Sequence, residues 1–255
     1  MVKLIIRADD IGYSEAVNYG IYKSVKDGLV ASAGLMPNMP YAKHGLDLLE
    51  GFDVSIGQHT NMCLGKPCAD PALIPSLVDE KGELKSSRTY REAFTKGEEF
   101  VVIEEAVIEI EAQYHKFLEL VGQKPDYFEA HAIMSKNIFK ALAIVAEKYD
   151  LPLMGISFDG TPTHFNKKLI NVLPMGSMSP DYDAYETLRD GVLNHAREDM
   201  PNVAVMHPGY LDDYLLNHSS LTVNRTKECA MLCDPAMRQW LNEHGVELIR
   251  YRDLL

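Results

Sequence analysis

The sequence lacks several patterns that would assign it quickly to a class. None of its four cysteines is spaced as C-x-x-C, which argues against a zinc knuckle or a dithiol redox site. We expect free thiols in a reducing compartment. No apolar run approaches the roughly 20 residues of a membrane-spanning helix. The apolar opening is short and leads directly into charged residues, unlike a signal peptide. These absences predict a cytoplasmic protein without a membrane partner.

Basic residues are also scarce. Lysine and arginine number 25 against 37 acidic residues, which gives a net charge of -12 and a pI near 5.2. This balance disfavours nucleic acid as a partner, and it suits a neutral or cationic small substrate. The chain has no G-x-x-x-x-G-K-[ST] loop, no G-x-G-x-x-G after its first strand and no G-x-S-x-G elbow. Nucleotide enzymes and serine hydrolases are therefore disfavoured.

What the chain does contain is an alternation of strand-like and helix-like segments. Strands are predicted at residues 4–6, 29–36, 54–57, 127–130, 153–156, 203–206 and 246–249. Helices are predicted between Ser14 and Gly28 and at residues 41–49, 98–121, 137–149, 182–197, 225–233 and 236–243. About seven strand–helix units predict one α/β domain over residues 1–255, an irregular (β/α) barrel of parallel strands with helical cover. An open doubly wound sheet is the alternative.

Two stretches interrupt this rhythm. Residues 60–97 are rich in Gly, Pro, Lys and Ser and keep no structural period. A loop of this length is usually a functional lid or binding loop, with a disordered surface insertion as the alternative. Residues 158–180 also look irregular, because they hold several glycines and prolines.

The first predicted strand ends in two adjacent acids, Asp9 and Asp10. Side chains alternate along an extended backbone, so the two carboxylates should point in different directions. One could then bind a metal while the other moves a proton. For an isolated Asp-Asp pair the alternative is a solvated strand end.

Three later strands also lead to chemically capable residues, namely His59, His131 and His207. In a β/α barrel the C-terminal strand ends converge on one face. Two histidines and one carboxylate suffice for a divalent ion with open positions. We assign Asp10, His59 and His131 to the metal, with Asp9 as base and His207 as acid. An exchange of roles between the two aspartates remains open. The other histidines are interpreted as surface residues: His44, His115, His164, His195, His218 and His244.

Four segments together resemble the YdjC-type carbohydrate deacetylases, the group that includes the bacterial chito-oligosaccharide deacetylases. They are residues 8–12 (Ala-Asp-Asp-Ile-Gly), residues 57–61 (Gly-Gln-His-Thr-Asn), the strand-end His131 and residues 206–210 (Met-His-Pro-Gly-Tyr). The resemblance covers nearly the whole chain, including Ser-Leu-Val-Asp at residues 76–79. Each motif alone is unspecific, whereas their order and spacing are more specific.

The resemblance implies an irregular β/α barrel that removes acetyl groups from acetylated mono- or oligosaccharides. It also implies one divalent cation, usually magnesium, and a homodimer. Asn61, in the second motif, becomes a candidate substrate-binding residue. On ligand chemistry alone, zinc, manganese and cobalt fit two histidines and a carboxylate at least as well as magnesium.

One segment departs from the family pattern. The family usually has Asp-Ser-His followed by histidines two and four residues later, whereas residues 129–135 here read Glu-Ala-His-Ala-Ile-Met-Ser. The reaction class therefore follows from the resemblance more directly than the substrate does. Two rivals stay open: another metal-dependent barrel hydrolase acting on a phosphoester or a different acyl group, and a catalytically silent sugar-binding protein. We interpret Arg225 and Glu228 as an ion pair on one helix face rather than as groups that orient the acids.

Overall fold

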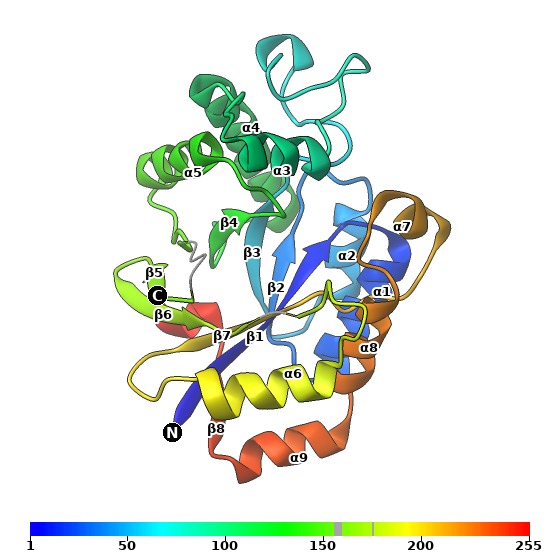
Figure 1. Cartoon of the computed structure of the whole chain (residues 1–255), viewed down its shortest axis with the longest axis vertical. Helices are drawn as coiled ribbons and strands as arrows, with labels where there is room; N and C mark the ends of the chain where they lie inside the picture. Colours follow the sequence, from blue (N-terminus) through cyan, green and yellow to red (C-terminus); the bar gives the residue numbers. More distant parts are fainter. Residues whose placement is uncertain (156–159, 175) are drawn as a thin grey trace.

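The centre of the molecule is a curled, mostly parallel sheet. The computed structural model describes residues 1–155, 160–174 and 176–255. The strand order is β4-β3-β2-β1-β7-β6-β5, with β8 paired to β1 (Figure 1). The strands are β1 Val2–Ile11, β2 Ser32–Leu35, β3 Ser55–Thr60, β4 Phe128–Ala130, β5 Thr163–Phe165, β6 Lys168–Val172, β7 Asn202–Met206 and β8 Val246–Leu248. Among these, only β5 and β6 pair antiparallel.

Strand β1 occupies the middle of the sheet because its side chains suit burial on both faces. Leu4, Ile5 and Ile6 are at most 2% exposed. The strand pairs in parallel with β2, β7 and β8, and Ile5 lies opposite Val203 of β7. Such continuous apolar runs are typical of parallel strands that are covered on both faces.

The sheet curls until its two edges almost meet. Leu153 forms an isolated parallel bridge with Phe128 of β4, and Met154 forms an antiparallel bridge with Phe165 of β5. The predicted irregular barrel is thus confirmed. The predicted strand at residues 153–156 is wrong as a regular strand, because residues 153 and 154 make only these bridges. Residue 156 lies outside the described residues.

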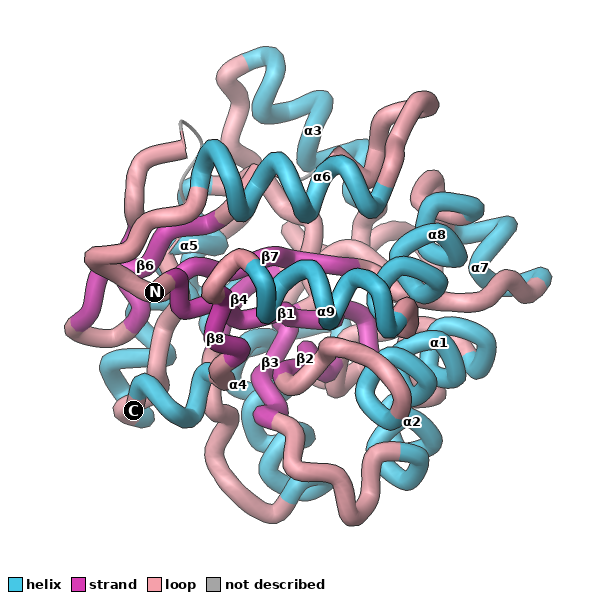
Figure 2. Tube along the Cα trace, turned by 90° about the horizontal axis from the view of Figure 1, so that it is seen from below, coloured by secondary structure: helices cyan, strands magenta, loops and turns pink. Residues whose placement is uncertain are grey.

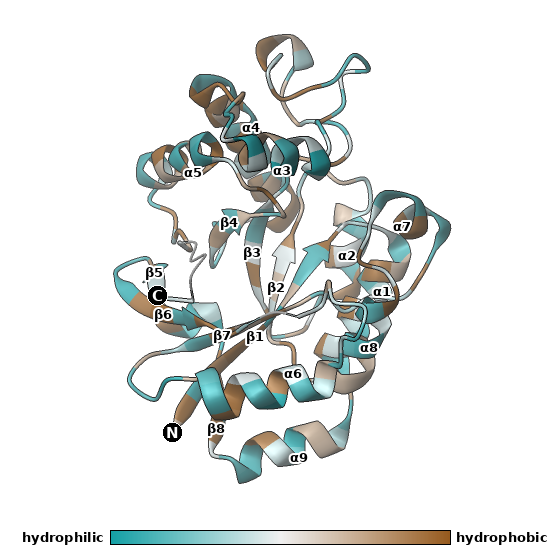
Figure 3. Ribbon diagram, in the orientation of Figure 1, coloured by the Kyte–Doolittle hydropathy of each residue, from teal (hydrophilic) through white to brown (hydrophobic). Residues whose placement is uncertain are grey.

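Helices surround the sheet, as the view from below shows in Figure 2. They are α1 Glu15–Lys26, α2 Ala42–Leu48, α3 Ser87–Lys96, α4 Ile103–Val121, α5 Lys136–Tyr149, α6 Ala184–Asp190, α7 Asp213–His218, α8 Val223–Leu232 and α9 Pro235–Glu243. Short turns are Pro71–Leu73, Gly191–His195 and Tyr251–Leu254. Hydrophobic residues concentrate on the central strands, while the helices are mixed (Figure 3). No helix within the described ranges combines the length and apolarity needed to span a bilayer.

The predicted long loop is more ordered than its composition indicates. Residues 60–97 contain α3 and a 3-10 turn, and Met62, Ile74, Leu77 and Tyr90 are buried against α4 and α5. Helix α3 escaped prediction because Tyr90 is its one buried residue, so it has no apolar stripe. The alternative of a disordered insertion is wrong, and a lid function stays a prediction.

Other differences from the prediction have local causes. The segment predicted as irregular, residues 158–180, contains the β5–β6 hairpin, while residues 158, 159 and 175 lie outside the described ranges. Helix α7 was not predicted. Helix α4 starts at Ile103 rather than residue 98, because the Glu99 carboxylate accepts hydrogen bonds from Ser135 and Asn137 and holds the preceding chain outside the helix. Ser14 caps α1 as predicted, and Pro235 opens α9.

Candidate metal centre

The two adjacent aspartates lie where β1 leaves its regular register. The pairing with β2 shifts between Ala8 and Ile11, and Asp10 has a φ of 81°. This left-handed conformation is uncommon outside glycine, although aspartate and asparagine adopt it more readily than most residues. The irregularity turns both carboxylates toward His59. The two carboxylates still approach different ring nitrogens of His59, which agrees with the expectation that Asp9 and Asp10 point in different directions.

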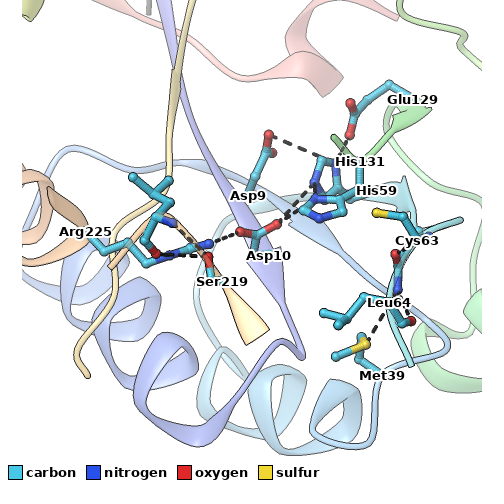
Figure 4. A network of polar contacts seen from close by, with 12 residues as sticks. Asp9, Asp10, Met39, His59, Cys63, Leu64, Glu129, His131, Ser219 and Arg225 are labelled. Atoms are coloured by element: carbon cyan, nitrogen blue, oxygen red, sulfur yellow. Dashed lines mark hydrogen bonds and ion pairs between the residues drawn. The ribbon is translucent and has the colours of Figure 1, made fainter. Parts of the chain in front are cut away.

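His59 lies at the centre of the site, and Asp9 and Asp10 approach its two ring nitrogens (Figure 4). Its Nδ1 lies 4.0 Å from Asp9 Oδ2, and its Nε2 lies 3.2 Å from Asp10 Oδ1. His131, which follows β4, places Nδ1 3.1 Å from the same Asp10 oxygen and 2.8 Å from His59 Nε2. The structure thus brings together the three predicted metal ligands, Asp10, His59 and His131.

This triangle of donor atoms fits a divalent ion. Ligands at about 2.0–2.2 Å from one ion stand roughly 3.0–3.5 Å apart, close to the three separations seen here. Asp10 Oδ1 is buried and has no well-aligned hydrogen bond from the described residues. Burial opposes charge on His131, but Asp10 outweighs it and raises the pKa of His131 to about 9. Near pH 7 His131 therefore carries a proton, and this proton supplies positive charge opposite Asp10.

Arg225 of α8 holds the other oxygen of Asp10. Its Nη2 donates to Asp10 Oδ2 at 2.7 Å, and both side chains are at most 2% exposed. Burial would raise the pKa of Asp10, but Arg225 and His131 together hold it well below its usual range. The predicted Arg225–Glu228 ion pair is wrong: the guanidinium of Arg225 pairs with Asp10 and orients it instead.

Two charged residues in contact with the site were missed from the sequence. Glu129 accepts a hydrogen bond from His59 Nδ1, because the two residues lie opposite each other on β4 and β3. Arg7 Nη2 donates to Asp9 Oδ2 at 2.7 Å and lies 3.6 Å from Glu129 Oε2. Each stands two residues before a predicted site residue, so strand alternation places it on the same face. A charge inside a buried strand was the available signal.

His207 follows β7, which lies next to β1. Burial lowers the pKa of its imidazole to about 4, against the pull of Asp10 and Asp9, so the ring is neutral near pH 7. Its Nδ1 is buried without a hydrogen-bond partner among the described residues. The backbone N–H of His207 donates to Glu228, which also accepts from the Tyr182 hydroxyl at 2.9 Å. Glu228 thus fixes the backbone that carries His207.

Asn61 is fully buried in the loop after β3, and its side chain is already hydrogen-bonded within the protein. The amide Nδ2 donates to Leu64 O at 2.8 Å and to Asn38 Oδ1 at 3.0 Å, while Oδ1 accepts from the backbone of Cys63. These contacts favour a role in holding the loop. Substrate binding by Asn61 stays a prediction.

The fold and the site define a class: α/β barrels that carry a histidine–carboxylate centre at the C-terminal ends of their strands. Within that class the chain belongs to the YdjC-like protein family, whose model it matches over residues 3–243. The resemblance drawn from the four motifs is confirmed.

Relatives in this family are described as carbohydrate deacetylases. The chain is 35% identical to carbohydrate deacetylase 2 of Listeria innocua, covering 99% of each chain. It is 32% identical to a carbohydrate deacetylase of Geobacillus stearothermophilus, covering 98% of this chain and 96% of the other. A crystal structure from Enterococcus faecalis, provisionally described as a cellobiose-phosphate cleavage protein, aligns with a TM-score of 0.82 at 27% identity, covering 99% of this chain and 98% of the other.

Proposed function

We propose that the protein is a metal-dependent carbohydrate deacetylase that hydrolyses the N-acetyl group of an amino sugar or its oligosaccharide, giving acetate and a free amine. The observation that carries this proposal is the triangle of Asp10 Oδ1, His59 Nε2 and His131 Nδ1 beside a further carboxylate, Asp9. Its setting in a family of carbohydrate deacetylases supports the same chemistry.

Asp10, His59 and His131 would hold the ion. A divalent cation there supplies a Lewis acid that polarises the acetyl carbonyl and acidifies water. Asp9 takes the proton of the attacking water as general base. Arg7 keeps Asp9 in place for this step through the 2.7 Å contact to Oδ2.

His207 completes the reaction as general acid by giving a proton to the departing sugar amine. Because burial keeps its pKa near 4, the ring starts neutral and has to take up a proton before it can give one; protonated Asp9 or solvent would supply it as negative charge develops beside the ring. Glu228 holds the backbone N–H of His207 and thereby the position of the ring.

The ion is proposed to be magnesium, as the family resemblance implies. Zinc, manganese and cobalt match the two-histidine set at least as well on ligand grounds. The protein is further proposed to act in the cytoplasm as a homodimer and a single domain of residues 1–255.

The test is acetate release from N-acetylglucosamine, its 6-phosphate and the chitin disaccharide, after metal removal and reloading with each ion. The phosphorylated sugar is included because the Enterococcus relative is described as cleaving a phosphorylated disaccharide. Asp10→Asn is the sharpest negative control, since asparagine tolerates the positive φ at this position. Asp126→Ala is the matched control, because it removes a half-buried carboxylate that holds Ile56 N, at the start of β3.

Metal-dependent acetate that is lost in Asp10→Asn and kept in Asp126→Ala is the expected result. Hydrolysis of a generic phosphoester without acetate would favour another barrel hydrolase. Sugar binding without turnover in the metal-loaded protein would favour a silent binding protein.

A further inference from the structure

Two groups of potential metal ligands meet at His59. One is the triangle of Asp10, His59 and His131, and the other consists of Asp9, His59 and Glu129. All three side chains of the second group are buried, with exposures of 1%, 3% and 7% in that order. Carboxylates and imidazole are ligands that divalent ions accept readily. On residue type alone, the second group is as suited to a cation as the first.

The two groups differ in where their cationic side chains lie. In the first, Arg225 takes the far oxygen of Asp10 and leaves Oδ1 directed at the two histidines. In the second, Arg7 lies between the carboxylates, 2.7 Å from Asp9 Oδ2 and 3.6 Å from Glu129 Oε2.

Arg7 is fixed in this position by its surroundings. Its side chain is buried in the barrel, the guanidinium carbon lies 5.4 Å from the centre of the Tyr127 ring, and Nη1 lies 3.4 Å from the Tyr251 hydroxyl. The Tyr251 ring in turn stacks on Tyr127, with the ring centres 4.1 Å apart. Burial opposes charge on Arg7, but Asp9 and Glu129 outweigh it and raise its pKa.

We infer that Arg7 takes the place of a second cation and thereby restricts the site to one metal ion. This inference rests on the proposed metal dependence and extends it. Asp9, Asp10 and Glu129 face two buried arginines, Arg7 and Arg225, so one divalent ion already turns the local charge positive. Without Arg7, Asp9 and Glu129 would be left as two buried carboxylates with a vacant position between them, which favours binding of a second divalent ion by these carboxylates, while His59 Nδ1 would join them only by releasing its proton to solvent.

The experiment counts Mn²⁺ per chain by equilibrium dialysis and elemental analysis, with electron paramagnetic resonance to detect coupled ion pairs. We expect one ion in the wild type and two in Arg7→Met. The double variant Arg7→Met/Asp9→Asn should return to one, because it loses a ligand of the new site. Arg225→Met is the matched control, because it removes the other buried arginine. Among the described residues, Arg225 does not lie between the members of a further ligand group, so this variant should bind no more than one ion.

Arg7→Lys provides a second variant that keeps the positive charge, and it should fold and bind one ion. An Arg7→Met protein that folds only with excess Mn²⁺ and then holds two ions agrees with the inference. One ion in folded Arg7→Met at saturating Mn²⁺, two ions in Arg7→Lys, or no folding of Arg7→Met with any metal would overturn it. The readout is the number of bound ions and not acetate release. If the wild type is an active deacetylase and Arg7→Met binds only one ion, this inference is refuted and the proposed function stands. A wild type that binds one ion but releases no acetate refutes the proposed function alone.

Discussion

Each of the adjacent aspartates has one oxygen held by its own buried arginine. Arg7 binds Oδ2 of Asp9, and Arg225 binds Oδ2 of Asp10. A charge-assisted contact of this kind both neutralises a buried carboxylate and fixes its orientation. Neither remaining oxygen has a well-aligned hydrogen bond among the described residues. Asp10 Oδ1 nevertheless lies 3.2 Å from His59 Nε2 and 3.1 Å from His131 Nδ1. Asp9, in contrast, comes no nearer than 4.0 Å to His59 and does so through the oxygen that Arg7 holds. This difference supports metal binding by Asp10 and proton transfer by Asp9.

Removing either proposed proton-transfer group should slow the chemical step and leave the metal bound. We expect Asp9→Asn and His207→Ala each to lower kcat by about a hundredfold or more, the usual contribution of a positioned acid or base. Steady-state acetate release, with metal content measured on the same samples, checks this. His195→Ala, an exposed histidine on the turn after α6, is the control. Near-native kcat in either variant with metal present would refute its role.

Glu129 should act through His59 rather than on the substrate. Its carboxylate accepts from His59 Nδ1 and so directs Nε2 toward Asp10. We expect Glu129→Ala to weaken metal binding by about 10–100-fold, as is usual when the partner of a ligating histidine is lost. Glu129→Gln keeps an acceptor oxygen and should lose less. Titration calorimetry with Mn²⁺ measures both, and equal affinity in Glu129→Ala and wild type would contradict the role.

At the scale of elements, β2 makes room for the acids of β1. A Cβ added at Gly34 would lie 3.0 Å from Asp9 Oδ1 and 3.0 Å from the Cβ of His59. Because small displacements of reacting groups are costly, we expect Gly34→Ala to lower kcat by roughly ten- to a hundredfold. Gly176→Ala, whose Cβ would make an ordinary 3.4 Å contact with Tyr182, serves as the control. Unchanged kcat in folded Gly34→Ala would show that the strand tolerates the methyl group.

The sequence was sufficient to predict the helices and strands that show a clear hydrophobic period or a capping residue. Helix α1 shows both, with Ser14 at its start, and the buried strands β1 and β7 read as apolar runs. It was insufficient where an element is short or polar all round, as in α3, α7 and the β5–β6 hairpin. Their stability comes from tertiary contacts that local periodicity does not encode.

The same limit applies to the site. Strand-end position alone was enough to group Asp10, His59 and His131. Arg225 could not be assigned in this way, because its partner Asp10 lies 215 residues away and the nearer Glu228 offered a plausible alternative. Pairings at such separations depend on how strands are ordered in the sheet, which the alternation of strands and helices leaves undetermined.

At the scale of the whole molecule, the proposed metal would compete with protons for the same histidines. Without metal, Asp10 raises the pKa of His131 to about 9. A group with a raised pKa stabilises the fold fully below its unfolded value, near 6.5, and loses that contribution as pH rises through about 9. Glu228 and His207 titrate lower, at about 7 and about 4. The metal-free protein should therefore lose stability between about pH 6.5 and 9, with Glu228 contributing at the lower end of that range.

Metal binding should show the opposite dependence on pH. Because ligating histidines must be neutral and the pKa values of both His59 and His131 are raised, we expect at least one proton released per ion at pH 7 and tighter binding as pH rises toward 9. Calorimetry in buffers of different ionisation enthalpy measures the proton count, and thermal unfolding of metal-free protein across the same range measures stability. No proton release at pH 7, with metal bound, would contradict a protonated histidine pair.

The position of β1 has a consequence for how the chain acquires its shape during synthesis. Strand β1 leaves the ribosome before the other strands of this sheet, yet its neighbour β7 and the arginine partner of its Asp10, Arg225, emerge some 200 residues later. Until then Asp10 lacks its arginine partner, and one edge of β1 is open. Contacts of such separation form slowly, and unpaired edges invite aggregation. Nascent chains that stall before β7 should therefore be the ones that depend most on chaperones.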